Sequence, residues 1–239
     1  MSYNDKKYFT KDTLNTCLRE LAKEYRRLAG KYAKAEIILV GGAAVLANYG
    51  FREMTSDIDA VIHAESSIKD AIITIGDIYN LPKGWINTDF IRTPSYTSKL
   101  DEYSVYYRTF SNILTVRTIN SEYLIAMKLK SGRQYKNDLS DIAGILKEQD
   151  IKNEPLCLEQ IKTAYENLYF SWENMPEISR SFIEGVLENN NYTEIYEETV
   201  KNEKNSKDIL ISFENMYPGT AKEENVNEIL KILKNKANN

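Results

Sequence analysis

Residues 36–62, EIILVGGAAVLANYGFREMTSDIDAVI, decide the fold of this chain. The stretch EIILV is a continuous, largely β-branched run, which is typical of a strand buried in a sheet. Two glycines at 41 and 42 end this run, and the alanine-rich AAVLANYG that follows predicts a short helix. A second strand is predicted over DIDAVIHA, residues 57–64. The segment therefore predicts strand, tight turn, helix and strand.

Periodicity extends this unit on both sides. An amphipathic helix is predicted over 11–33, with Asp12 or Thr13 near its cap, and a strand is predicted over 112–119. Further amphipathic helices are predicted over 66–80, 121–132, 137–149, 157–170, 177–189, 192–202, 207–217 and 226–236. The expected fold is α/β (α+β): a small mixed-sheet core with flanking helices, followed by a C-terminal helical region. We expect a catalytic domain over 1–150, including the helix 11–33, and a helical domain over 151–239.

Hydropathy, cysteine and histidine content, and charge limit the classes of function that this chain can have. No stretch approaches the roughly 18 apolar residues of a membrane span, and the polar N-terminus resembles no signal peptide, so a soluble, cytoplasmic protein is expected. Cys17 and Cys157 match no metal-ligand spacing, and the single histidine, His63, is expected to end a strand. The net charge is +2 for residues 1–150 and −6 for residues 151–239. A compact phosphate ligand, or one small region of an RNA, fits this balance better than long nucleic acid.

The Gly41-Gly42 turn suits phosphate binding. Glycine lets the backbone approach a ligand closely, and the helix that follows presents amide donors at its first turn. No Gly-Lys-Ser/Thr follows, which excludes a Walker loop. By itself such a pair is more often an ordinary tight turn.

Asp57 and Asp59 lie two residues apart in the predicted second strand, so both side chains point to one face. Two close carboxylates repel each other unless a cation lies between them, and hard oxygen ligands favour magnesium. The alternative is that Asp57 terminates the strand while Asp59 is only solvated.

Strand, Gly-Gly, short helix and Asp-x-Asp together resemble the signature of the polymerase-beta nucleotidyltransferase superfamily. Residues 36–62 are especially similar to small bacterial nucleotidyltransferases that include abortive-infection (AbiEii-like) toxins. The resemblance implies that Asp57 and Asp59 hold Mg²⁺ and act in catalysis. It also implies that a nucleoside triphosphate binds at the turn and beside it, through Gly41, Gly42, Ala43 and Arg52.

Two later stretches extend the resemblance, LPKGWINTDF at 81–90 and YLIAMKLKSGRQYKNDLSDIAGIL at 123–146. The resemblance assigns Lys128 to catalysis and to the leaving pyrophosphate, Arg133 and Asp138 to nucleotide binding, and Asp141 to catalysis. The residues alone leave other interpretations open. Lys128 is then a solvated surface lysine, Asp138 is a helix cap, and Asp141 pairs with Arg133 or Lys136.

One position departs from the superfamily pattern. Polymerase-type members carry a third metal-binding acid on a later strand, whereas residues 112–119 contain Arg117 and no carboxylate. Asp89, or Asp101 with Glu102, remains a candidate for the missing ligand.

The expected reaction is transfer of a nucleoside monophosphate from a nucleoside triphosphate to an acceptor hydroxyl. A tRNA end, a protein hydroxyl and a small antibiotic all remain open as acceptors, and the resemblance favours RNA, tRNA above all. It also implies a toxin of a toxin-antitoxin or phage-defence system, with a cognate antitoxin as partner. The alternatives are a catalytically degenerate binding module and an aminoglycoside-type transferase.

Overall fold

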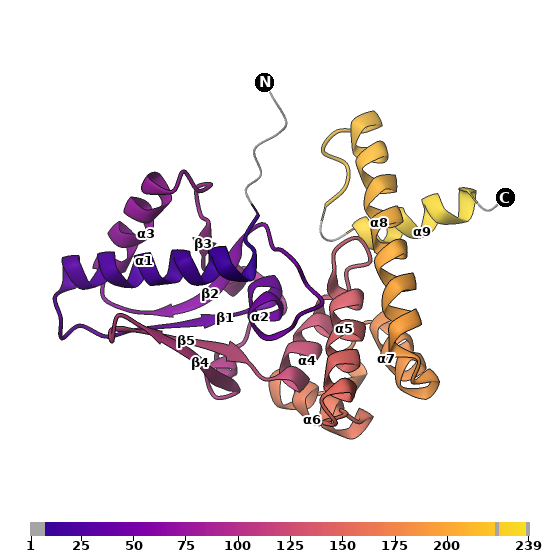
Figure 1. Cartoon of the computed structure of the whole chain (residues 1–239). Helices are drawn as coiled ribbons and strands as arrows, with labels where there is room; N and C mark the ends of the chain where they lie inside the picture. Colours follow the sequence, from indigo (N-terminus) through magenta and orange to yellow (C-terminus); the bar gives the residue numbers. More distant parts are fainter. Residues whose placement is uncertain (1–7, 223–224, 238–239) are drawn as a thin grey trace. The chain divides into compact units, whose positions relative to one another are not determined.

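The computed structural model describes residues 8–222 and 225–237. They form two compact units, drawn in Figure 1. Unit 1 contains residues up to 127 together with 167–169, and unit 2 contains 128–166 and the residues from 170 onward. Helices α4 (Ser121–Ser131) and α6 (Leu158–Tyr169) contribute residues to both units. The boundary at residue 150 between a catalytic domain and a helical domain stays a prediction.

Unit 1 is built on a five-stranded mixed sheet with the order β3-β2-β1-β5-β4. The strands are β1 (Ala35–Leu39), β2 (Ile58–His63), β3 (Ile86–Asn87), β4 (Ser104–Phe110) and β5 (Leu114–Ile119). The central strand β1 runs antiparallel to β2 and parallel to β5. This central place explains the continuous apolar run in its sequence, because both faces of the strand are covered. The predicted mixed-sheet core is confirmed.

Three helices flank this sheet: α1 (Lys11–Ala29), α2 (Gly41–Asn48) and α3 (Ser67–Ile78). Helices α1 and α3 pack against each other (Figure 1). The cap of α1 is Thr10, whose side chain accepts a hydrogen bond from the Thr13 amide, and Asp12 and Thr13 lie in the first turn, near this cap, as predicted. Two short 3-10 helices, η1 (Asp89–Arg92) and η2 (Ser98–Asp101), precede β4.

Strands β3 and β4 were not predicted from the sequence. Strand β4 is at the edge of the sheet, and most of its side chains are exposed, so it lacks the alternation that marks a half-buried strand. Two tyrosines at this strand make packing contacts: Tyr103, directly before β4, stacks on Tyr123 with ring centroids 3.8 Å apart, and the Tyr107 hydroxyl donates to Asn15.

Unit 2 is helical. It contains α5 (Asp138–Ile151), α7 (Glu177–Asn189), α8 (Tyr192–Met216), α9 (Val226–Ala237) and the 3-10 helix η3 (Trp172–Asn174), with α8 packed along α5. The prediction of separate helices over 192–202 and 207–217 is wrong. The linking residues 203–206 contain neither Gly nor Pro, and Glu203 and Ser206 are buried, so α8 continues unbroken. Within the described residues, no helix is long and apolar enough to cross a membrane.

Candidate active site

The end of β1 and the start of β2 lie side by side. In the antiparallel register Leu39 is opposite Ala60, and one step further the Val40 amide donates to the Asp59 carbonyl oxygen at 3.0 Å. Since α2 starts directly after Val40, this pairing brings the glycine turn next to the Asp-x-Asp segment. Residues separated by more than a dozen positions in sequence thus form one corner of unit 1.

Both glycines in this corner are required by geometry. Gly41 has a φ of +54°, in the left-handed region that favours glycine, and a Cβ there would lie 3.6 Å from the Asp59 Oδ2. A Cβ on Gly42 would lie only 2.8 Å from the Thr55 Oγ1 and 2.9 Å from the Arg52 Nη2. Larger residues would therefore fill the space between the first turn of α2 and these polar side chains.

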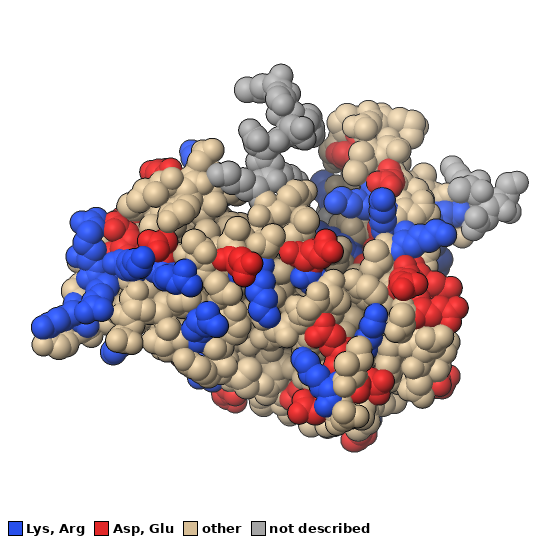
Figure 2. All heavy atoms as spheres, in the orientation of Figure 1, with Lys and Arg blue, Asp and Glu red and all other residues tan. Residues whose placement is uncertain are grey.

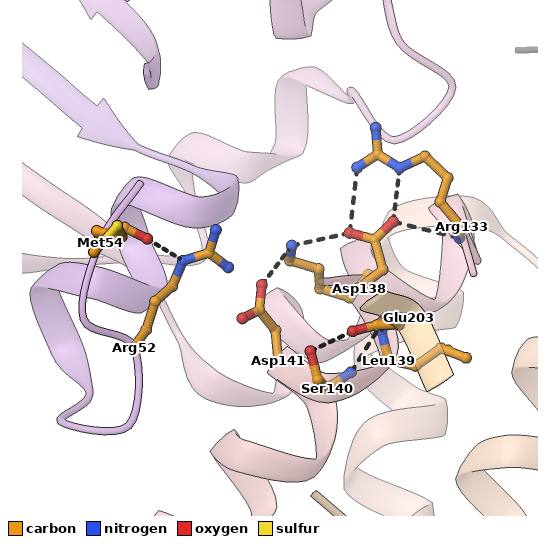
Figure 3. Close-up of polar contacts among 9 residues, drawn as sticks. Arg52, Met54, Arg133, Asp138, Leu139, Ser140, Asp141 and Glu203 are labelled. Atoms are coloured by element: carbon orange, nitrogen blue, oxygen red, sulfur yellow. Dashed lines mark hydrogen bonds and ion pairs between the residues drawn. The ribbon is translucent and has the colours of Figure 1, made fainter. Parts of the chain in front are cut away.

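The segment 52–55 is held in place by backbone contacts. Thr55 exchanges two backbone hydrogen bonds with Phe9, with N to O distances of 2.7 and 2.9 Å, and its side chain is buried. Arg52 curls back so that its Nε donates to the Met54 carbonyl at 3.2 Å (Figure 3). A guanidinium and a hydroxyl are therefore fixed beside the Gly41-Gly42 turn.

The two aspartates differ in exposure. Asp57 immediately precedes β2 and is exposed, and its Oδ1 accepts a hydrogen bond from Ser56 Oγ at 3.1 Å. Asp59 is half-buried, between the buried Ile58 and Ala60, with its carboxylate directed at the glycine turn. Asp57 lies outside β2, so the expectation that both carboxylates point to one face stays a prediction.

Asp57 and Asp59 stay the predicted metal ligands of this corner. In the described part of the chain, no three His, Cys, Asp or Glu side chains lie close enough together to form a metal site. Asp89 lies in η1, and Asp101 forms a contact of 2.9 Å with the Nε2 of His63, which ends β2 as predicted. A divalent cation at Asp57 and Asp59 would take its remaining oxygen ligands from phosphate and water, as magnesium commonly does.

Unit 2 contains the second set of predicted residues, gathered at the first turn of α5. The Lys128 Nζ lies 2.9 Å from Asp138 Oδ1 and 2.8 Å from Asp141 Oδ2. The Arg133 Nε donates to the Asp138 Oδ2 at 2.7 Å (Figure 3). Lys128 is 7% exposed and both aspartates are buried, so the interpretation of Lys128 as a solvated lysine is wrong. Asp138 is not the cap either, because the cap of α5 is Asn137.

Asp138 is held in its charged form. Burial alone would raise the pKa of its carboxyl, but the Lys128 charge and the Arg133 hydrogen bond outweigh burial and lower the pKa to about 2. Removing one partner of such a buried network leaves an uncompensated charge. The roles assigned to Lys128, Arg133, Asp138 and Asp141 in nucleotide binding and catalysis stay predictions.

Glu203 of α8 is a member of this cluster that sequence reasoning missed. Its Oε1 accepts from the Leu139 amide at 2.8 Å and from the Ser140 amide at 3.3 Å, and its Oε2 contacts the Ser140 hydroxyl. Asn137 makes no side-chain cap, so this glutamate caps α5 from 64 residues further along the chain. No local motif signals such a contact.

Burial raises the pKa of Glu203 to about 8, and its three hydrogen bonds offset this only in part. The nearby Asp141 charge acts in the same direction as burial. The strongly acidic carboxyl of Asp138, in the first turn of α5, thus lies near the weakly acidic carboxyl of Glu203, which caps this helix from α8.

The mixed sheet, with its Gly-Gly turn against an Asp-x-Asp strand, defines a nucleotidyltransferase-like domain. Residues 16–198 match the model of the family described as "Nucleotidyltransferase of unknown function (DUF6036)". The match covers most of the chain, which therefore belongs to this family. No curated protein and no solved structure matches the chain.

Proposed function

We propose that this protein is a magnesium-dependent nucleotidyltransferase that moves a nucleoside monophosphate from a nucleoside triphosphate to an acceptor hydroxyl, releasing pyrophosphate. The observation that carries the proposal is the corner in which the Asp59 carboxylate faces the Gly41 turn, 3.6 Å from the position of a Cβ. The family described as a nucleotidyltransferase supports the same class.

Each part of the corner has a task in this reaction. The amides at Gly41, Gly42 and Ala43 belong to the first turn of α2, where backbone N–H groups have no partner within the helix, and they would bind phosphate oxygens. Asp57 and Asp59 would hold Mg²⁺, which neutralises charge on the triphosphate when it is bound. Arg52, fixed beside Gly42, would contact the nucleotide. The protein contributes positioning and charge stabilisation, as in other phosphoryl transfers.

For the acceptor we propose an RNA hydroxyl, with tRNA as the first candidate, on the strength of the resemblance to toxin nucleotidyltransferases. That resemblance also supports a role in a toxin-antitoxin or phage-defence system with an antitoxin partner. The resemblance assigns Lys128, Arg133, Asp138 and Asp141 to the same chemistry. A catalytically degenerate, nucleotide-binding module is the rival function, because the described residues contain no group of three acidic, histidine or cysteine side chains that could hold a metal ion.

The test is to incubate purified protein with Mg²⁺, each labelled nucleoside triphosphate, total tRNA and cell extract, and to follow the label on gels. Asp57→Ala is the matched variant, because this exposed side chain is removed without disturbing the core. Label that appears on tRNA with the parent protein and disappears with Asp57→Ala supports the proposal. Label transfer that Asp57→Ala retains contradicts the assigned site.

Nucleotide binding without transfer to any acceptor favours the degenerate module instead. Label on protein or on a small molecule supports nucleotidyl transfer but shows that the acceptor is not RNA. Isothermal titration calorimetry with a non-hydrolysable triphosphate, with and without Mg²⁺, shows whether a protein that transfers no label still binds the nucleotide.

A further inference from the structure

Helix α1 has one exposed face made of basic residues. Arg19, Lys23, Arg26 and Arg27 follow one another at spacings of four, three and one, which places them along one side of the helix. All four are exposed. Lys31 and Lys34, in the connection to β1, are exposed as well and continue the series. We call these six residues the basic strip. Figure 2 shows Lys and Arg gathered over α1 and the turn that follows it.

The strip is strongly positive for a chain whose net charge is −4. Residues 19–34 contain six basic and two acidic residues, a net charge of +4. Glu20 and Glu24 pair within the helix, with Lys23 at 2.7 Å and Arg27 at 2.6 Å. Exposed pairs of this kind are weak and readily exchange for another anion.

Two further cations of the strip are held by neutral groups. The Arg26 Nη1 donates to the Ser111 carbonyl at 3.2 Å, and the Lys34 Nζ donates to the Asn112 carbonyl at 3.1 Å. Both carbonyls belong to the turn between β4 and β5. These bonds fix the positions of two positive charges without neutralising them. The basic strip therefore keeps its positive electrostatic potential.

An exposed aromatic ring lies within the strip. Tyr32 is 83% exposed, and the Lys31 Nζ lies 4.9 Å from the centroid of its ring. An exposed tyrosine among ordered cations is the combination with which proteins bind single-stranded nucleic acid, phosphates on the cations and a base on the ring. Stabilisation of the helix dipole accounts for Arg26 and Arg27 in the last turn, but it does not account for Arg19, Lys31 or Lys34.

We propose that the basic strip binds the phosphate backbone of single-stranded nucleic acid, with Tyr32 stacking on one base. The surface lies entirely within unit 1. It needs neither a triphosphate nor a metal ion, so the proposal stands or falls independently of nucleotidyl transfer.

The test is fluorescence anisotropy of the full chain with labelled single strands of about 20 nucleotides, as RNA and as DNA, from about 50 to 300 mM salt and without nucleotide or Mg²⁺. The variant is Lys31→Gln with Lys34→Gln. The matched control is Lys201→Gln with Lys204→Gln, which removes the same charge from exposed positions of α8. Each lost phosphate contact lowers the slope of log affinity against log salt by about 0.7, so the double variant should lose about 1.4.

Loss of affinity in the strip variant, with the control near the parent, supports the proposal, and a further loss in Tyr32→Ala supports stacking. RNA bound more tightly than DNA would identify RNA as the partner, and equal binding would leave single strands of either kind, which also supports the proposal. No binding at about 50 mM salt, or equal loss in both double variants, overturns it. Competition by polyglutamate as effective as by RNA also overturns it, because the partner is then an acidic protein.

Discussion

The amide of Val40 donates to the carbonyl oxygen of Asp59 at 3.0 Å. This bond joins the last residue before α2 to the second aspartate of the Asp-x-Asp segment. It therefore sets the distance between the turn proposed to bind phosphate and the carboxylates proposed to bind magnesium. Changes that alter this corner should affect nucleotide binding before they affect the rest of unit 1.

Gly42→Ala should weaken nucleoside triphosphate binding and lower stability. The new Cβ would lie 2.8 Å from the Thr55 Oγ1, closer than real contacts allow, and Thr55 is held by Phe9 on its backbone. Over-packing of this kind costs about 1–3 kcal/mol. Urea unfolding and titration calorimetry measure the two effects.

Thr55→Ala provides the control for this prediction, because it removes the nearest of the atoms that the new Cβ meets, the others belonging to Arg52. The double variant Gly42→Ala with Thr55→Ala should lose less stability than the sum of the single variants. Strict additivity would show that the contact is not the cause.

Lys128→Met should destabilise the protein by about 3–5 kcal/mol, because it leaves two buried carboxylates without their common partner. The ammonium lies within 2.9 Å of both Asp138 and Asp141. Lys152→Met, which removes an exposed lysine 3.8 Å from Glu148, should cost about 0.5 kcal/mol or less. Equal costs in chemical denaturation would disprove a buried ion cluster.

The lowered pKa of Asp138 predicts a loss of stability in acid. The folded-state pKa of about 2 lies below the unfolded value of about 3.9, so the unfolded chain binds the proton first as the pH falls. The contribution is complete above pH about 4 and is lost toward pH about 2, and it amounts to roughly 2–3 kcal/mol. Asp138→Asn lacks this group, so its free energy of unfolding should change less over that range. Parallel pH curves for the two proteins would contradict the prediction.

Glu203 predicts the opposite pH dependence. Its folded-state pKa of about 8 lies above the unfolded value of about 4.3, so the folded protein holds the proton more tightly between these values. The free energy of unfolding should therefore fall as the pH rises from about 5 to about 8, by roughly 3–4 kcal/mol.

Glu203→Gln should remove this dependence and keep the cap. The Gln carbonyl oxygen can accept from the Leu139 and Ser140 amides, while its amide donates to the Ser140 hydroxyl. Thermal unfolding should therefore show the Gln variant gaining stability over the parent with rising pH, whereas Glu203→Ala should be destabilised at every pH. A Gln variant that loses stability like the Ala variant would refute the proposed titration.

Much of the fold was predictable because its signals are local. The apolar run of β1, the two glycines and the spacing of the aspartates are signals from neighbouring residues, and the mixed sheet confirmed the strands β1 and β2 that they predict. The edge strand β4 was missed since both of its faces are largely exposed, which removes the alternation on which strand prediction depends.

The sequence by itself determined the first strand, the glycine turn, the close spacing of the two aspartates and the amphipathic helices, because chain periodicity and backbone geometry act over a few residues. Only the tertiary structure decided that Thr55 and Arg52 close on Gly42, that Lys128 is shared by two buried carboxylates, and that Glu203 caps α5. Those contacts join residues that are 10 or more positions apart. Whether a lysine or glutamate lies at the surface or in a buried charge network depends on how the helices and strands pack.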